Sequence, residues 1–139
     1  MAITRFKGQY EFLSNMYPTI LYVDGEIYPS AEHAFQAMKC LNRDDRIAMS
    51  VCRSAKEAKQ AGRLVDLRPD WEDVKVDLMY KVLKAKFEDP ELAQKLKGTK
   101  EETLVEGNTW GDDFWGVNSK GQGKNMLGQL LMKVRKELA

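Results

Sequence analysis

Segments with the spacing and the end signals of amphipathic helices occupy most of the chain from residue 54 onwards. Four of them stand out, at residues 54–62, 71–87, 89–98 and 125–138. Ser54 and Asp89 are capping residues at the starts of two of these segments, and Asp70 is a candidate cap for a third. Gly62 and Gly98 favour termination. Helices therefore dominate the predicted fold.

A hairpin signal lies nearer the N-terminus, in the stretch "ILYVDGEIY". Asp24 and Gly25 separate two β-prone runs, and Gly tolerates the positive φ that a tight turn requires. Pro29 and Ser30 then end the strand, and Ser30 can cap the helix that carries Glu32. Helices with a small antiparallel β element near the N-terminus predict an α+β fold.

The composition predicts one globular domain over residues 1–139. The chain is too short for two comfortable domains, and 43% of its residues are apolar, which is enough to build a core. A net charge of +1 argues against wholesale binding to nucleic acid or to an anionic membrane. We find neither a signal peptide nor a run long enough to span a membrane, so we expect a soluble, cytoplasmic protein.

The cysteines and the histidine exclude a conventional zinc site. Cys40 and Cys52 do not form a CxxC pair, and His33 is the only histidine, so a Cys/His cluster cannot be assembled. We expect reduced thiols packed as small apolar groups, and a structural role for His33. The sequence also lacks a GxSxG elbow, a GxxxxGK[ST] phosphate loop and a dinucleotide fingerprint.

One polar stripe lies on the helix predicted within "YPSAEHAFQAMK". Glu32, Gln36 and Lys39 recur at i, i+4 and i+7, opposite an apolar side that includes Ala34 and Leu41. Periodicity alone favours a solvated face of an ordinary amphipathic helix. The flanking Phe35, which would be poorly placed in water, favours the wall of a functional site instead.

A second unusual stretch is "EGNTWGDDFWGVNSKGQGKN". It combines Glu106, Asp112, Trp115 and Asn125 with five glycines, and it has neither helical nor strand periodicity. Aromatic rings beside carboxylates and glycines are typical of loops that line ligand sites, where a ring stacks on a flat ligand. A loop that its tryptophans pin to the core explains the pattern equally well.

Two further stretches carry groups that could hold a sugar or a phosphate. "FKGQYEFLSN" brings Phe12, Ser14 and Asn15 together, although a plain edge strand and turn is the interpretation that the residues favour. Arg63 and Arg68 in "GRLVDLRPDW" could clamp a phosphate through bidentate contacts. Exposed arginines are common, so the pattern favours no special role for either.

Six stretches, in this order, carry a family resemblance that spans nearly the whole chain. They are "FLSN", "DG" followed by "YPSAEHAFQAMK", "AGRLVDLRPDW", "MYKVLKAKF", "LVEGNTWGDDFWG" and "GKNMLGQLLMKVR". The sequence resembles the YbiA-like family, also called NADAR. It departs from the family pattern at Tyr28, where many members have Trp, and the stretch after Trp115 is shorter than in some relatives.

The resemblance implies a helix-rich α+β fold and an N-glycosidase activity that needs no metal and no cofactor. The implied substrates are phosphoribosylamino-pyrimidine intermediates of riboflavin synthesis, or ADP-ribosylated guanine, which extends to ADP-ribosylated nucleic acid. Both join ribose through its anomeric carbon to an exocyclic amine, so the substrate is a ribosylamine or an ADP-ribosyl compound. The alternatives are a non-catalytic module that binds ADP-ribose or another NAD metabolite, and a helical interaction domain.

The resemblance also implies roles for individual residues. The catalytic set is Glu32, Lys39, Glu106 and Asp112. The substrate-binding set is Phe12, Ser14, Asn15, Gln36, Arg63, Trp115 and Asn125. Glu32 would shuttle protons, and Lys39 would hold the sugar as an imine. Asp112 matches the acid of the family pattern, and Trp115 would cover the sugar carbon on which Glu32 and Lys39 converge.

Lys86 is the rival imine former. Lys81 and Lys84 lie on the same segment, and they predict that Lys86 belongs to a solvated basic face.

Overall fold

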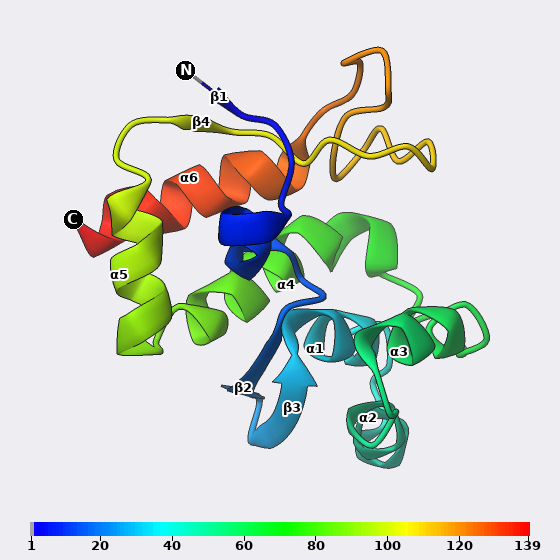
Figure 1. The fold of residues 1–139 in the computed structure, drawn as a ribbon. Helices are drawn as coiled ribbons and strands as arrows, with labels where there is room; N and C mark the ends of the chain where they lie inside the picture. Colours follow the sequence, from blue (N-terminus) through cyan, green and yellow to red (C-terminus); the bar gives the residue numbers. More distant parts are fainter. Residues whose placement is uncertain (1) are drawn as a thin grey trace. The chain divides into compact units, whose positions relative to one another are not determined.

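The computed structural model describes residues 2–139 and shows a helix-rich α+β fold (Figure 1). The chain forms two compact units. The central unit is Asn15–Lys86, and the terminal unit combines the chain up to Ser14 with Phe87–Ala139. The elements of the central unit are β2 (Pro18–Val23), β3 (Glu26–Ser30), α1 (Ala31–Ala37), α2 (Arg43–Ser50), α3 (Ala55–Ala61) and α4 (Trp71–Lys86).

The predicted hairpin is confirmed. β2 and β3 pair antiparallel, with Leu21 opposite Tyr28 and Val23 opposite Glu26. The connecting residues Asp24 and Gly25 have φ of 52° and 82°. Positive φ at both central positions gives the two-residue turn whose twist matches that of the strands, which is why Asp-Gly is favoured there.

α1 follows β3 without a loop and starts as the sequence predicts. The Ser30 side chain accepts a hydrogen bond from the backbone N–H of His33 at 3.1 Å, so it caps the helix. Every residue from Ala31 to Ala37 is buried, because α1 contacts α2, α3, α4 and both strands of the hairpin. The helix ends at Ala37, and Leu41, predicted on its apolar side, therefore lies 64% exposed.

α2 has no counterpart in the sequence analysis. Four of its eight residues are charged and only Met49 is buried, so it offers no apolar stripe to recognise. Asn42 caps it by accepting hydrogen bonds from Asp44 N and Asp45 N. α2 packs against α1 and β3 within the central unit.

α3 and α4 complete the central unit. Ser54 caps α3 as predicted, by accepting from Glu57 N at 3.1 Å, and Gly62 follows its last residue. α4 contacts α1 and β2, and its fully buried side includes Met79, Val82 and Leu83. The Asp70 carboxylate, predicted to cap α4, binds the Arg68 guanidinium.

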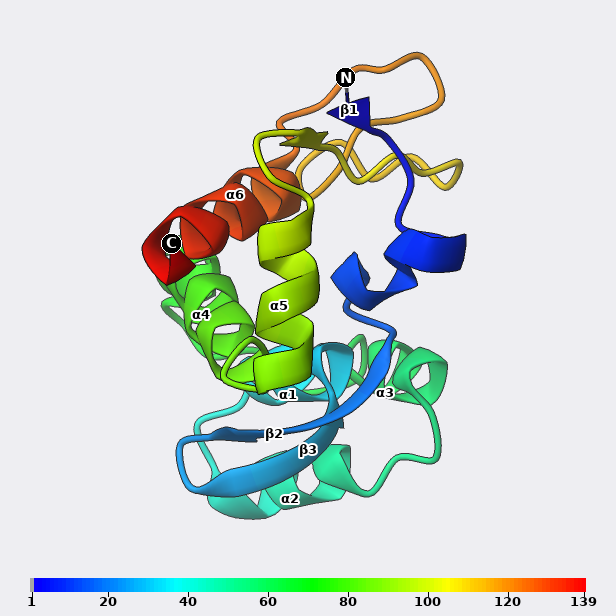
Figure 2. The same ribbon diagram turned by 60° about the vertical axis from the view of Figure 1, so that its left-hand side comes forward.

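The terminal unit contains β1 (Ala2–Ile3), the 3₁₀ helix η1 (Gly8–Leu13), α5 (Pro90–Gly98), β4 (Thr103–Leu104) and α6 (Met126–Leu138). β1 and β4 form a short parallel pair, and β4 and α5 contact α6 (Figure 2). Asp89 caps α5 as predicted. The edge strand expected around Phe12 is wrong, because residues 8–13 form η1.

No helix within residues 2–139 combines the length and the apolar character needed to cross a bilayer.

Candidate functional site

The polar stripe that starts on α1 is not the solvated face that periodicity alone favours. Glu32 is 8% exposed and Gln36 is 5% exposed, while Lys39 is half-buried. Helical periodicity predicts a solvent-exposed face only when one side of the helix has no neighbour. α1 is covered by α2, α3, α4 and both strands of the hairpin. Removing a carboxyl group and an amide from water costs free energy, which makes this stripe the leading candidate for a functional site.

Glu32 occupies the first turn of α1 and is held at both its backbone and its side chain. Its backbone N–H donates to the carbonyl of Asn15 at 2.9 Å, and its Oε1 accepts from Gln36 Nε2 at 2.8 Å. Burial raises the pKa of Glu32, while the bond from Gln36 and the positive charges of Lys59 and Lys39 oppose that rise. The protonated carboxyl is therefore favoured more than it is in water.

Lys39 lies just beyond the last residue of α1. Its backbone N–H donates to Gln36 O at 3.1 Å, and its Nζ donates to the carbonyl of Gly62 at 3.4 Å. Burial lowers the pKa of Lys39; the charge of Glu32 opposes this, and the charge of Arg63 adds to it. A lysine with a lowered pKa has a larger neutral fraction, which is the form that attacks a carbonyl or an imine.

Trp71 is a residue of this site that the sequence analysis did not assign. Lys39 Nζ lies 5.9 Å from the centroid of the Trp71 ring, whose own neighbour is Phe35 at 5.2 Å between centroids. Trp71 ends the stretch "AGRLVDLRPDW", which also supplies Gly62 to the site. The sequence signal for Trp71 is therefore this stretch as a whole, because Gly62 near its start and Trp71 at its end both lie close to Lys39.

Asn15 and Arg63 are the other members of the predicted set that belong to the central unit. Asn15 is buried beside the start of α1, and its Nδ2 lies 3.4 Å from the sulfur of Met79. Arg63 is exposed next to Gly62. Arg68, considered as a phosphate clamp, is instead engaged with Asp70 and with the carbonyl of Met38.

Gly62 provides a test of the packing between α3 and the stripe. A Cβ at this position would lie 1.9 Å from Gln36 Oε1. We expect Gly62→Ala to displace the Gln36 amide from Glu32, to reduce activity by roughly tenfold and to destabilise the fold by about 1–3 kcal/mol, the usual cost of overpacking a buried site. Gly98→Ala is the matched control, because a Cβ there meets nothing within 4 Å. Equal activity in both variants would contradict a role for the Gln36 amide.

His33 has the structural role that the sequence predicts. Its Nε2 lies 3.0 Å from the carbonyl of Cys52, which can only accept, so Nε2 carries the hydrogen. Its Nδ1 then accepts from the Ser30 hydroxyl at 2.7 Å. Cys40 and Cys52 are both free thiols.

The glycine-rich loop of the terminal unit is ordered by its own polar side chains. Asp112 Oδ1 accepts from the backbone N–H groups of Phe114 and Trp115, at 3.1 Å and 3.0 Å. Asn108 binds the backbone of Asp112 at both its N–H and its carbonyl. The predicted acid therefore shapes the loop, and its participation in catalysis stays a prediction.

Asn125 also holds this part of the terminal unit together. It adopts a left-handed backbone with φ of 52°, and its amide bridges Leu104 O and Glu106 N, each at 2.9 Å. Gly116 is required close by, since a Cβ there would lie 2.2 Å from the carbonyl of Glu106. These contacts fix the loop where β4 meets α6.

The tryptophans and the remaining predicted residues of the terminal unit differ in burial. Trp110 is 61% exposed, whereas Trp115 is half-buried against the edge of Phe114. Phe12 is buried, with Lys95 Nζ 5.9 Å from its ring centroid, and Ser14 and Glu106 are half-buried. Trp110 is thus not pinned to the core. Substrate binding by Phe12, Ser14 and Trp115 and catalysis by Glu106 stay predictions.

Comparison with known proteins identifies the family. Residues 4–139 match the NADAR domain. The chain belongs to the NADAR family. It is 41% identical to the N-glycosidase YbiA of Escherichia coli over 133 residues, which is 94% of this chain and 82% of that protein. The solution structure of E. coli YbiA superposes with a TM-score of 0.85 and 39% identity, covering 99% of this chain and 86% of that one.

Other NADAR relatives are parts of longer proteins. A riboflavin biosynthesis protein of Vibrio vulnificus is 40% identical over 91% of this chain but only 35% of its own length. The chloroplastic riboflavin biosynthesis protein PYRR of Zea mays is 36% identical over 80% of this chain and 20% of its own length. The NADAR domain therefore occurs both nearly alone and attached to other sequence.

Lys86 does not lie on the solvated basic face predicted for this NADAR chain. It is 1% exposed, whereas Lys81 and Lys84 are exposed. Lys86 follows Met79, Val82 and Leu83 at helical spacing, so it shares their buried side of α4. Burial lowers the pKa of Lys86 to about 7.

We expect Lys86→Met to change stability in a pH-dependent way. The unfolded lysine titrates near 10.5 and the folded one near 7, so folding releases a proton between these values and wild-type stability rises with pH there. Its stability relative to the variant should rise by up to about 1.4 kcal/mol per pH unit. Urea unfolding at pH 7.0, 8.0 and 9.0 measures this, and a pH-independent difference would contradict it. Retained activity would remove Lys86 as the imine former.

Proposed function

We propose that this NADAR protein is an N-glycosidase that hydrolyses the bond between ribose C1 and an exocyclic amine. The observation that carries the proposal is the burial of Glu32 in α1 and the partial burial of Lys39 just beyond its last residue, which raises the pKa of the acid and lowers the pKa of the amine. The name of the YbiA relative, N-glycosidase, agrees with this chemistry. A protonated acid and a neutral amine are the two groups that the cleavage of a glycosylamine requires.

The proposed reaction begins with the open-chain imine of the ribosylamine. Lys39 Nζ adds to C1 and passes one of its protons to the nitrogen of the heterocycle, and Glu32 gives that nitrogen a second proton. The C1–N bond to the heterocycle breaks, the heterocycle leaves as a free amine, and a protonated imine joins C1 to Lys39. Water then adds to C1 and returns a proton to the Glu32 carboxylate, and departure of Lys39 as a neutral amine releases the free sugar. The net change is the addition of one water molecule.

The surroundings of the central site support this chemistry in two ways. Partial burial keeps water from the Lys39 amine, which favours its neutral form. Gln36 Oε1 and Asn15 Oδ1 are buried and have no hydrogen-bond donor among the described residues. Buried amide oxygens of this kind are typical of sites that bind a ligand or a water.

The relatives favour one of the two substrate classes. Two of them are named riboflavin biosynthesis proteins, and they match 91% and 80% of this chain. We therefore propose a phosphoribosylamino-pyrimidine as the substrate ahead of ADP-ribosylated guanine.

The test is a turnover assay on both substrate classes with product detection by mass spectrometry. We expect free ribose 5-phosphate from the phosphoribosylamino-pyrimidine, and a borohydride-reducible sugar adduct on the peptide that contains Lys39. Lys39→Met protein purified in parallel controls for contaminating activity. Stabilisation by ADP-ribose without product from either substrate would overturn the proposal in favour of a binding module.

A further inference from the structure

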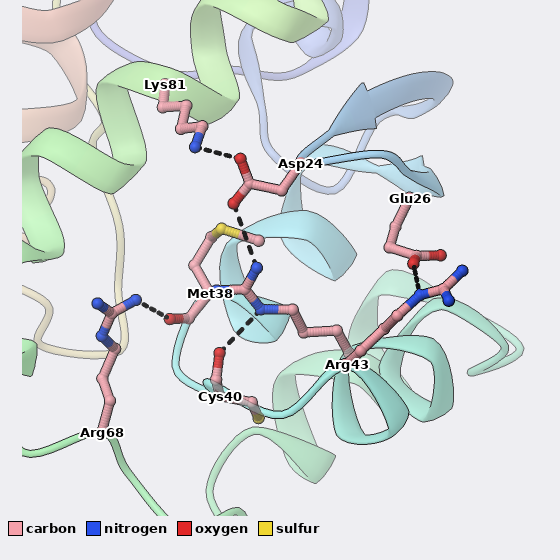
Figure 3. Close-up of polar contacts among 8 residues, drawn as sticks. Asp24, Glu26, Met38, Cys40, Arg43, Arg68 and Lys81 are labelled. Atoms are coloured by element: carbon pink, nitrogen blue, oxygen red, sulfur yellow. Dashed lines mark hydrogen bonds and ion pairs between the residues drawn. The ribbon is translucent and has the colours of Figure 1, made fainter.

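The backbone that carries Lys39 ends α1 with three consecutive carbonyl groups, and two arginines bind all of them. Arg68 Nη1 donates to Met38 O at 3.4 Å (Figure 3), and the backbone N–H of Arg68 donates to Lys39 O at 2.9 Å. Arg46 Nε donates to Cys40 O at 2.8 Å. The last carbonyls of a helix have no partner within the helix, so these bonds satisfy groups that would otherwise be unpaired.

Each arginine is itself fixed by a carboxylate. Arg46 Nη1 lies 3.2 Å from Asp24 Oδ2, and Arg68 makes a two-bond contact with Asp70, at 2.7 Å and 3.1 Å. Lys81 also pairs with Asp24 (Figure 3). The side chains of Arg46 and Arg68 are 15% and 14% exposed, so both donors are held in place and shielded from water.

Arg43 makes a useful contrast on the same helix. Like Arg46, it joins α2 to an acid of the hairpin, through a 2.6 Å pair with Glu26 (Figure 3). Its side chain is 77% exposed and, within residues 2–139, forms a hydrogen bond with Glu26 alone. Exposed pairs of this kind contribute little to stability. The two arginines therefore differ in whether they reach the backbone beside Lys39.

We propose that Arg46 and Arg68 are positioning residues that hold the 38–40 backbone and thereby fix the Lys39 amine beside Glu32, Trp71 and the Gly62 carbonyl. The expected effect on kcat rests on the proposed N-glycosidase function, whereas the expected effect on the position of the Lys39 amine does not. A small displacement of the backbone here moves the amine away from its neighbours, and misplacement of a reacting group by about 1 Å can cost roughly 100-fold in rate.

The test compares Arg46→Gln with Arg43→Gln, and it measures the Lys39 amine directly. Acetic anhydride labelling across a pH series, followed by peptide mass spectrometry, gives the midpoint at which Lys39 becomes reactive. We expect an upward shift of this midpoint in Arg46→Gln and no shift in Arg43→Gln. An amine that is no longer held in place is hydrated, and hydration raises its pKa towards the ordinary value. Lys56, an exposed lysine of α3, is the internal reference. For the enzyme, kcat of Arg46→Gln should fall roughly tenfold with KM nearly unchanged.

Arg46→Lys distinguishes the positioning role of the guanidinium from the effect of its charge and from unfolding of the protein. The charges that act on the Lys39 amine are those of Glu32, Arg63, Cys40 and Lys59, and the lysine variant keeps the charge of Arg46 opposite Asp24. A lysine at position 46 carries one ammonium group and cannot bind Cys40 O and Asp24 with the fixed geometry of a guanidinium. We therefore expect Arg46→Lys to restore thermal stability while the labelling midpoint of Lys39 stays shifted. If Arg46→Gln does not fold, this variant carries the test.

The possible results separate the two proposals. A wild-type midpoint in Arg46→Lys and in any folded Arg46→Gln would overturn the positioning role. A shifted midpoint in the Arg46 variants, together with a wild-type protein that hydrolyses no ribosylamine, would overturn the proposed function and leave the positioning role intact.

Discussion

Lys39→Met should abolish turnover and leave the fold at least as stable as that of the wild type. Loss of a covalent nucleophile typically costs roughly 10⁴-fold or more in rate. The stability gain follows from the pKa of Lys39, which burial lowers from its ordinary 10.5. The folded state therefore disfavours the charged amine, and at pH 7 the wild type carries a penalty that a methionine removes.

The sign of the Lys39 effect can be checked by varying pH. The unfolded chain binds more protons than the folded one between the folded pKa and 10.5, so wild-type stability relative to the variant should rise with pH in that window. Urea unfolding and kcat are the measurements, and Lys56→Met on the exposed side of α3 is the control. An active Lys39→Met enzyme would eliminate the imine mechanism.

Glu32→Gln should lower kcat by roughly 10² to 10⁴-fold, the usual range for loss of a general acid or base. The substitution keeps the shape of the side chain and an oxygen that can accept from Gln36 Nε2, so the hydrogen bond at 2.8 Å survives. What is lost is the proton that the leaving amine needs. A variant that retains full activity would show that another group supplies this proton.

Glu32→Gln should also change how stability depends on pH. The folded pKa of Glu32 lies above its ordinary 4.5, so the folded state binds more protons and wild-type stability falls as pH rises through this window. The variant should match the wild type at pH 4 and exceed it at pH 7. Glu57→Gln, at an exposed position of α3, should show no such trend.

Most of the secondary structure could be predicted from short stretches, because its causes are local. The Asp24-Gly25 turn and the caps at Ser30, Ser54 and Asp89 depend on a few neighbouring residues, and all four are confirmed. α2 could not be predicted, since a helix stabilised mainly by a cap and by packing of one methionine leaves no periodic signal.

The sequence by itself determined the family, the hairpin and the capped helices, and it singled out Glu32 and Lys39 as the candidate acid and amine. Only the tertiary structure decided that the polar stripe that starts on α1 is buried, because covering of the polar face depends on segments far away in the chain. It placed Trp71 and the Gly62 carbonyl beside Lys39, and it moved Lys86 from a presumed solvated face into the interior. The pKa shifts of Glu32 and Lys39 arise from that burial, which a helical pattern alone does not contain.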